Sequence, residues 1–458
     1  MGDRETRYDL TEGSIWRKLL WFFLPIAAGT LFQQLYNTVD AVVVGRFVGT
    51  EALAAVGGSA AQVISLFIGF FVALTGGAGA VIAQLYGASR RGAVEDAAHS
   101  AIAFSILVGL AVTALGIPLT PLVLRWMRTP PDTMAGAVGY LRVYFSGTLF
   151  VMLFNMGSSI LRAAGDSRRP LYYLIASCVA NIVLDLVFVL ALRMGVLGVA
   201  LATVLSQLLS AALVLRRLVH TEEAYRIDLR RLRMHKPIMR RMLAIGIPAG
   251  LQSSMFALSN LIIQVAVNSL GTVVVAAWTM TGKVDGVYWA VSGVLGTAVT
   301  SFVGQNFGAG RKDRIKKSIR ISLGLFMAVT LVMEGLLLLF GRFGLGLFTA
   351  DQAVAAYTWR ILTYFVPYYF IWTFIEVISG MLRGVGDAVV PVVITGLGIC
   401  ALRLVWVATV FQKVHTVLGL SLCYPASWLI TAAALSVYYL RGHWTTLKPA
   451  DAAVPAVK

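Results

Sequence analysis

The run NIVLDLVFVLAL at 181–192 places two polar side chains in an otherwise apolar stretch. Asn181 and Asp185 are four residues apart, so on a helix they project from one face. A carboxylate inside a membrane segment costs about 2.5–3.5 kcal/mol on insertion scales, and such residues usually mark an ion or proton pathway. The alternative is that Asp185 only bonds a hydroxyl or backbone group at a helix contact.

A second carboxylate, Asp40, falls at a matching depth. Asp185 lies about 15 residues into its apolar run, or roughly 22 Å along a helix, and Asp40 lies a similar way into the first run. Two buried carboxylates are not both ionised cheaply, so the pair predicts a proton site or, with the Asn181 oxygen, a hard-cation site. A carboxyl poised between its two forms can release a proton when a cationic substrate arrives. Asp40 could instead lie at an interface, near a helix end.

The elements that position these residues are expected to be membrane-spanning helices. The chain has 458 residues, of which 58% are hydrophobic and 13% charged. Continuous apolar runs of about 20 residues predict helices rather than a barrel with alternating strands. We expect twelve spans, at 17–44, 52–86, 95–122, 134–161, 170–192, 197–215, 239–269, 273–305, 319–341, 356–382, 388–411 and 417–440.

The basic residues predict the orientation. Of the 38 Lys and Arg residues, 28 lie in the N-terminal segment, the even-numbered connections and the C-terminal tail, whereas six lie in the odd-numbered connections. The side rich in Lys and Arg is cytoplasmic, so both termini should lie in the cytoplasm of a multi-pass plasma-membrane protein. Topology therefore explains the net charge of +17, and we expect no nucleic-acid partner.

The chain repeats itself. LRAAGDSRRP (161–170) returns as LRGVGDAVVP (382–391), and AQLYGA (83–88) returns as GQNFGA (304–309), both at an offset of 221. Six spans in each half predict two parallel bundles, related by a pseudo-two-fold axis along the membrane normal. The expected organisation is an N-terminal segment 1–16, a first lobe 17–215, a basic linker 216–238, a second lobe 239–440 and a tail 441–458.

These features resemble the multidrug and toxic compound extrusion (MATE) transporters. The resemblance is carried by the twelve spans, the segment LPIAAGTLFQQLYNTVDAVVVGRFVG (24–49) and the two paired motifs. It implies a bacterial secondary transporter that exports amphipathic or cationic small molecules against an inward flow of H⁺ or Na⁺. The same superfamily includes flippases and exporters of lipid-linked or polysaccharide substrates, which remain the alternative.

The resemblance also assigns residues. In the DinF-like branch of the family the coupling ion is held in the first lobe, on positions that here are Asp40, Asn181, Asp185 and Thr203. Span seven has no acidic residue, unlike the branch that couples through the second lobe. Further polar residues in or near the spans are candidates for the substrate cavity: Gln33, Tyr36, Asn37, Asn155, Glu376 and Arg403. Glu376 and Arg403 could instead neutralise each other.

Other classes of protein are disfavoured. No Asp-rich metal motif, H-E-x-x-H pair or phosphate-binding loop is present, so we expect neither an enzyme nor an ATP-driven pump. Cys178, Cys400 and Cys423 have no metal-ligand spacing. We therefore expect no catalytic residues, no cofactor and no metal beyond a Na⁺ at the coupling site. The expected partners are the lipid bilayer and small-molecule substrates, with the protein itself a monomer.

Overall fold

A computed structural model describes residues 9–348 and 351–449 of the chain. The first half contains α2 (Ile15–Val43), α3 (Thr50–Ala55), α4 (Ala61–Gly87), α5 (Arg91–Trp126), α6 (Pro131–Ser146), α7 (Thr148–Ala163), α8 (Arg168–Leu186) and α9 (Gly195–Val219). The second half contains α10 (Lys236–Asn268), α11 (Thr272–Gly308), α12 (Lys312–Phe348), α13 (Gln352–Phe365), α14 (Tyr369–Val385), α15 (Val389–Thr395), α16 (Leu402–Ala408), α17 (Val410–Val414), α18 (Val417–Ser421) and α19 (Cys423–Leu440).

Short turns of other helix types join or extend these helices. π-helical turns occupy Val44–Val48, Val56–Ala60, Val187–Ala191 and Gly396–Ala401, and 3₁₀ turns occupy Leu229–Arg231, Val366–Tyr368 and His443–Thr446. The described residues contain no strand. Only helices and closed barrels satisfy every backbone group in lipid, so an all-helical fold is the one that these apolar runs can adopt.

The prediction of twelve spans is confirmed. Among the described residues, eleven helices or continuous helix pairs are long and apolar enough to cross a membrane, and α6 with α7 makes a twelfth. This last span is bent by 49° at Gly147, where the side chain of Val204 approaches so closely that a Cβ would lie 2.6 Å from it. The chain is therefore a multi-pass membrane protein.

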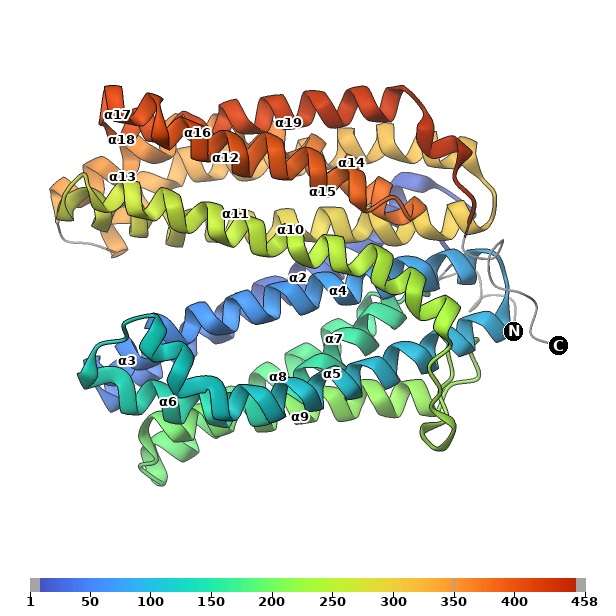
Figure 1. Ribbon diagram of the computed structural model, residues 1–458, viewed down its shortest axis with the longest axis horizontal. Helices are drawn as coiled ribbons and strands as arrows, with labels where there is room; N and C mark the ends of the chain where they lie inside the picture. Colours follow the sequence, from blue (N-terminus) through green and yellow to red (C-terminus); the bar gives the residue numbers. More distant parts are fainter. Residues whose placement is uncertain (1–8, 349–350, 450–458) are drawn as a thin grey trace.

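The two halves form two bundles. Figure 1 shows α2–α9, coloured blue to green, on one side and α10–α19, coloured lime to red, on the other. The bundles converge at the end where α2 begins and where α9 is connected to α10; we call this the basal end. They diverge toward the opposite end (Figure 1). Both expected halves are thus present, and α9 and α10 extend by a few residues into the linker that we expected at 216–238.

Helices α4, α10 and α11 make the seam between the bundles, since α4 packs along both α10 and α11. Small residues permit this approach: a Cβ on Gly77 would lie 2.4 to 2.5 Å from the backbone of Gly246, which is closer than real Cβ contacts allow. The basal part of α2 also crosses the seam. Leu19, Phe22 and Phe23 are buried in the apolar core of the second half, although the outer part of α2 packs on α8.

Candidate functional site

The structure brings Asp40 to Asp185. Helices α2 and α8 run side by side in the same direction, and Cys178 Sγ donates to the carbonyl oxygen of Phe32 at 3.8 Å. From Phe32 and Cys178, two turns farther along each helix is about 11 Å at 1.5 Å per residue. At that level α2 has reached Asp40, and α8 has reached the residue after Asp185. The two carboxyl groups lie close enough for the charge of each to affect the other. The depth argument from the sequence therefore corresponds to a contact in the fold.

Five buried polar atoms at this contact have no hydrogen-bond partner within the described chain. They are Oδ1 of Asp40, Nδ2 and Oδ1 of Asn181, and both carboxyl oxygens of Asp185. Asn181 is 1% exposed and Asp185 is 0% exposed. Buried polar groups are nearly always paired, and leaving one unpaired costs about 1–3 kcal/mol. A proton shared between the carboxyls, or a small cation among the oxygens, would satisfy these atoms.

Thr203 lies beside Asn181 by helix register. Ser177 Oγ on α8 donates to the carbonyl oxygen of Ser206 on α9 at 2.7 Å, which fixes the alignment of the two antiparallel helices. One turn outward along α8 is Asn181, and one turn back along α9 is Thr203, which is buried. The Thr203 hydroxyl donates to its own helix, to the carbonyl oxygen of Val199 at 3.0 Å. Its lone pairs remain available as acceptors.

Two tyrosines lie near the acid pair, a third stacks on one of them, and sequence reasoning identified one of the three. Tyr36, which we expected in the cavity, lies within electrostatic range of Asp40. Tyr140 on α6 lies within range of both Asp40 and Asp185, and its ring stacks on that of Tyr144 at a centroid distance of 6.3 Å. The spacing of Tyr140 and Tyr144 places two phenols on one helix face, a signal present in the sequence that we did not use.

Among the described residues, the remaining first-lobe candidates make no hydrogen bond to the acid pair. Gln33 and Asn37 are exposed on α2, and Asn37 Nδ2 donates to Gln34 Oε1 at 3.5 Å. Asn155 on α7 is half-buried and donates to the carbonyl oxygen of Val151 on its own helix at 2.8 Å. Its amide is therefore satisfied locally, unlike that of Asn181.

Glu376 and Arg403 do not pair with each other. Glu376 Oε2 lies 3.8 Å from Arg383 Nη2, two turns farther along α14, and both side chains pack over Gly296 of α11. Arg403 is 5% exposed; its guanidinium donates to Ser427 Oγ at 3.4 Å and lies over the ring of Tyr424. The mutual neutralisation that the sequence left open is therefore wrong, because the packing of α14 gives Glu376 a nearer cation.

Asn260 is the second hydrogen-bond partner of Arg403, at 3.3 Å from Nη1. In the described part of the chain no carboxylate lies within 4.0 Å of the Arg403 guanidinium, although Asp285 and Arg403 both lie within electrostatic range of Tyr424. Asp285 is itself satisfied, since its Oδ2 accepts from Trp289 Nε1 and from the Tyr369 hydroxyl, each at 2.9 Å. This buried acid in the second lobe has two donors, whereas Asp185 has none.

The described residues contain no group of three or more His, Cys, Asp or Glu side chains placed to hold a metal.

The two LRxxGD turns, at 161–166 and 382–387, have the helix-capping role that their residue types predict. Gly165 and Gly386 adopt positive φ angles of 91° and 95°, and Asp166 accepts from the backbone nitrogens of Arg168 and Arg169 at the start of α8.

Comparisons with known proteins agree with this arrangement. The family model described as MatE matches the chain twice, at residues 25–187 and 248–409. The two matches are about half a chain apart and correspond to the two bundles, so they identify the internal repeat independently of the short motifs.

Two curated relatives span nearly the whole chain. The "Probable multidrug resistance protein YoeA" of Bacillus subtilis (strain 168) is 28% identical over 438 residues, covering 94% of each chain. The "Multidrug export protein MepA" of Staphylococcus aureus (strain bovine RF122 / ET3-1) is 23% identical over 451 residues, covering 96% of this chain and 97% of the relative.

Two solved structures share the fold. One, described as "Outward-facing conformation of a multidrug resistance MATE family transporter of the MOP superfamily", matches with a TM-score of 0.88, 22% identity, and coverage of 95% of this chain and 97% of that one. The other is described as "Reverse polarity of binding pocket suggests different function of a MOP superfamily transporter from Pyrococcus furiosus Vc1 (DSM3638)". It matches with a TM-score of 0.89, 22% identity and the same coverage.

Proposed function

Because this chain belongs to the MatE family of membrane transporters, we propose that it is a secondary efflux transporter of the DinF-like branch. Its substrates are amphipathic or cationic small molecules, and an inward flow of H⁺ or Na⁺ drives their export. The observation that supports this function best is the acid pair with its five unpaired buried atoms. A static core would have paired them or replaced them with apolar groups.

The coupling site consists of Asp40, Asn181, Asp185 and Thr203. With a proton, one carboxyl becomes a donor to the other, and the buried charge of the pair falls to one. With Na⁺, carboxylate, amide and hydroxyl oxygens form the kind of ligand set that hard cations prefer. In both cases the bound ion offsets the free-energy cost of burying the carboxylates. The occupied and the empty site are therefore stable in different protein environments. That difference in free energy is what can be linked to a change in the position of the lobes.

Export also requires a substrate site that faces alternate sides. Gln33, Tyr36 and Asn37 form a polar face of α2 that lies on the basal side of Asp40. We propose that this face lines the substrate cavity in the first lobe. Asn155, Glu376 and Arg403 are the further candidates. In the described part of the chain, Arg403 does not form a cluster with other cations. A pyrophosphate-linked lipid substrate would need such a cluster, so drug-like amphipaths remain the better match.

The membrane orientation follows from the basic residues. The basal end carries the α9–α10 linker and the starts of α2 and α12, which are rich in Lys and Arg. The positive-inside rule puts this end in the cytoplasm of a bacterial cell, with the protein as a monomer in the plasma membrane. The bundles converge there and diverge toward the other end (Figure 1). We assign the structure to a state open toward the outside.

The test is transport by the purified protein in liposomes, with a proton gradient and a sodium gradient imposed separately. A fluorescent amphipathic cation such as ethidium serves as the substrate. Accumulation that depends on one of the two gradients supports the function. Accumulation that is equal with and without both gradients contradicts it.

A further inference from the structure

The two motifs that repeat in the sequence contact each other across the seam between the lobes. Gln84 Nε2 in AQLYGA donates to the carbonyl oxygen of Gly384 in LRGVGD at 2.7 Å. Gln305 Nε2 in GQNFGA donates to the carbonyl oxygen of Ala163 in LRAAGD, also at 2.7 Å. Donors and acceptors are each 221 residues apart in sequence. The second hydrogen bond is therefore the pseudo-two-fold copy of the first.

The backbones of the same motifs cross in the same reciprocal way. A Cβ added to Gly87 would overlap the carbonyl oxygen of Gln305, and a Cβ added to Gly308 would overlap the carbonyl oxygen of Gln84. Each motif thus needs its glycine so that α4 and α11 can touch. We call the two glutamine hydrogen bonds and these two glycine contacts the clasp.

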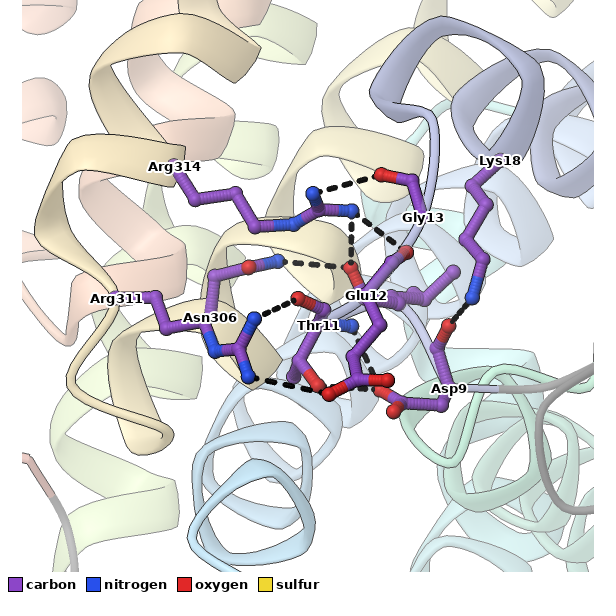
Figure 2. A network of polar contacts seen from close by, with 9 residues as sticks. Asp9, Thr11, Glu12, Gly13, Lys18, Asn306, Arg311 and Arg314 are labelled. Carbon is purple, nitrogen blue, oxygen red and sulfur yellow. Dashed lines mark hydrogen bonds and ion pairs between the residues drawn. The ribbon is translucent and has the colours of Figure 1, made fainter.

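A short N-terminal segment closes over one side of the clasp. Residues 9–13, here called the strap, precede α2 and lie against the start of α12 (Figure 2). The backbone nitrogen of Leu10 donates to Gln305 Oε1 at 3.0 Å, and its carbonyl oxygen accepts from Asn306 Nδ2 at 3.2 Å. Both side chains of Gln305 and Asn306 are 0% exposed. Asn306 corresponds to Leu85 in the first half, so the strap uses a donor that only the second copy of the motif has.

Two arginines of the second lobe hold the rest of the strap. Arg314 donates through Nη1 to the carbonyl oxygen of Gly13 and through Nη2 to that of Glu12, each at 2.8 Å. Arg311 donates to the carbonyl oxygen of Thr11 at 3.0 Å and pairs with Glu12 Oε1 at 3.3 Å. Figure 2 shows these side chains reaching from α12 and the turn before it toward the strap.

We propose that the clasp is the cytoplasmic gate of the transport cycle and that the strap is its latch. This inference rests on the proposed function, because a gate must open only if the lobes alternate. Neutral amides bonded to carbonyl oxygens suit a contact that breaks, since breaking them strands no buried charge. The two-fold pairing also means that both sides of the gate release together, because each lobe is the donor in one of the two bonds and the acceptor in the other.

The clasp can be tested by measuring the separation of the lobes at the basal end. Nitroxide labels are attached at Arg216→Cys on α9 and Lys317→Cys on α12, both of which are exposed, and distances are measured by pulsed electron resonance in nanodiscs. Gln84→Leu and Gln305→Leu each remove one side of the clasp. Gln252→Leu is the matched control, because Gln252 is buried and donates to Thr395 Oγ1 at 2.8 Å within the second lobe alone.

We expect Gln84→Leu to raise the ratio of long to short distances by about 2- to 12-fold, as the loss of one neutral hydrogen bond implies. Gln305→Leu should raise the ratio by at least as much, because it also removes the bond that Gln305 Oε1 accepts from Leu10 in the strap. Gln252→Leu should leave the ratio unchanged. Arg314→Gln should shift the ratio in the same direction by loosening the strap, with the exposed Arg320→Gln as its control.

Glycine variants keep the test valid if a glutamine variant does not fold. Gly87→Ala should force the basal ends apart, whereas Gly293→Ala, which has open space around it, should not. Unchanged distances in all the clasp variants, or an equal shift in Gln252→Leu, overturn the gate. The readout is independent of transport. Shifted distances in a protein that moves no substrate would leave the clasp standing and refute the proposed function instead.

Discussion

Asn181→Leu offers a test in which loss of function should come with a gain in stability. Both polar atoms of the Asn181 side chain are buried without a partner in the described chain. Replacing the amide by an apolar group of similar volume removes a desolvation cost of about 1–3 kcal/mol. With about 2.1 cal/mol/K of unfolding entropy per residue over 458 residues, this corresponds to a rise of about 1 to 3 °C in the midpoint of thermal unfolding.

The assay is thermal unfolding of the purified protein, with and without the coupling ion. A ligand at 100 times its Kd stabilises the folded state by about 2.7 kcal/mol, so the ion should stabilise the wild type and not Asn181→Leu. Asn155→Leu is the control, since Asn155 already donates to the carbonyl oxygen of Val151 and gains nothing by substitution. The reasoning is refuted if Asn181→Leu is no more stable than Asn155→Leu, or if the ion stabilises it as much as the wild type.

Two further predictions concern the second lobe and the topology. Glu376→Gln should alter the preference among substrates and keep the dependence of transport on H⁺ or Na⁺, because Glu376 pairs with Arg383 and lies outside the acid pair. Competition between two fluorescent substrates measures the preference, and loss of the ion dependence would contradict the prediction. A cysteine placed at exposed His220 in the α9–α10 linker should resist impermeant thiol reagents added to intact cells and react after the cells are opened, whereas labelling in intact cells would reverse the orientation.

Much of the first-lobe site follows from the sequence because depth in a membrane is one-dimensional. The expected spans place Asp40 and Asp185 both in the outer part of the bilayer, and helix periodicity aligns Asn181 with Asp185. The fold brings these side chains together. Tyr140 was missed, since which face of a span turns toward the acids depends on how α6 packs, and periodicity alone does not give that rotation.

Contacts between lobes could not be read from sequence in the same way. The repeat offset marks Gln84 and Gln305 as equivalent, yet equivalence says nothing about which residue each one bonds. The partners follow from the position of the two-fold axis, which passes between α4 and α11. Likewise Glu376 and Arg403 are the evident opposite charges in the second half. The helical spacing of Glu376 and Arg383 along α14 nevertheless gave a closer pair.

The central claim is that the acid pair couples the ion gradient to export. Asp40→Asn and Asp185→Asn should be examined beside the wild type and Glu376→Gln in liposomes carrying the gradient that drives the wild type. We expect both aspartate variants to insert and to lose gradient-driven accumulation of substrate, and Glu376→Gln to keep its response to the gradient. Near-wild-type accumulation by both aspartate variants, or loss of coupling in Glu376→Gln alone, would contradict the account.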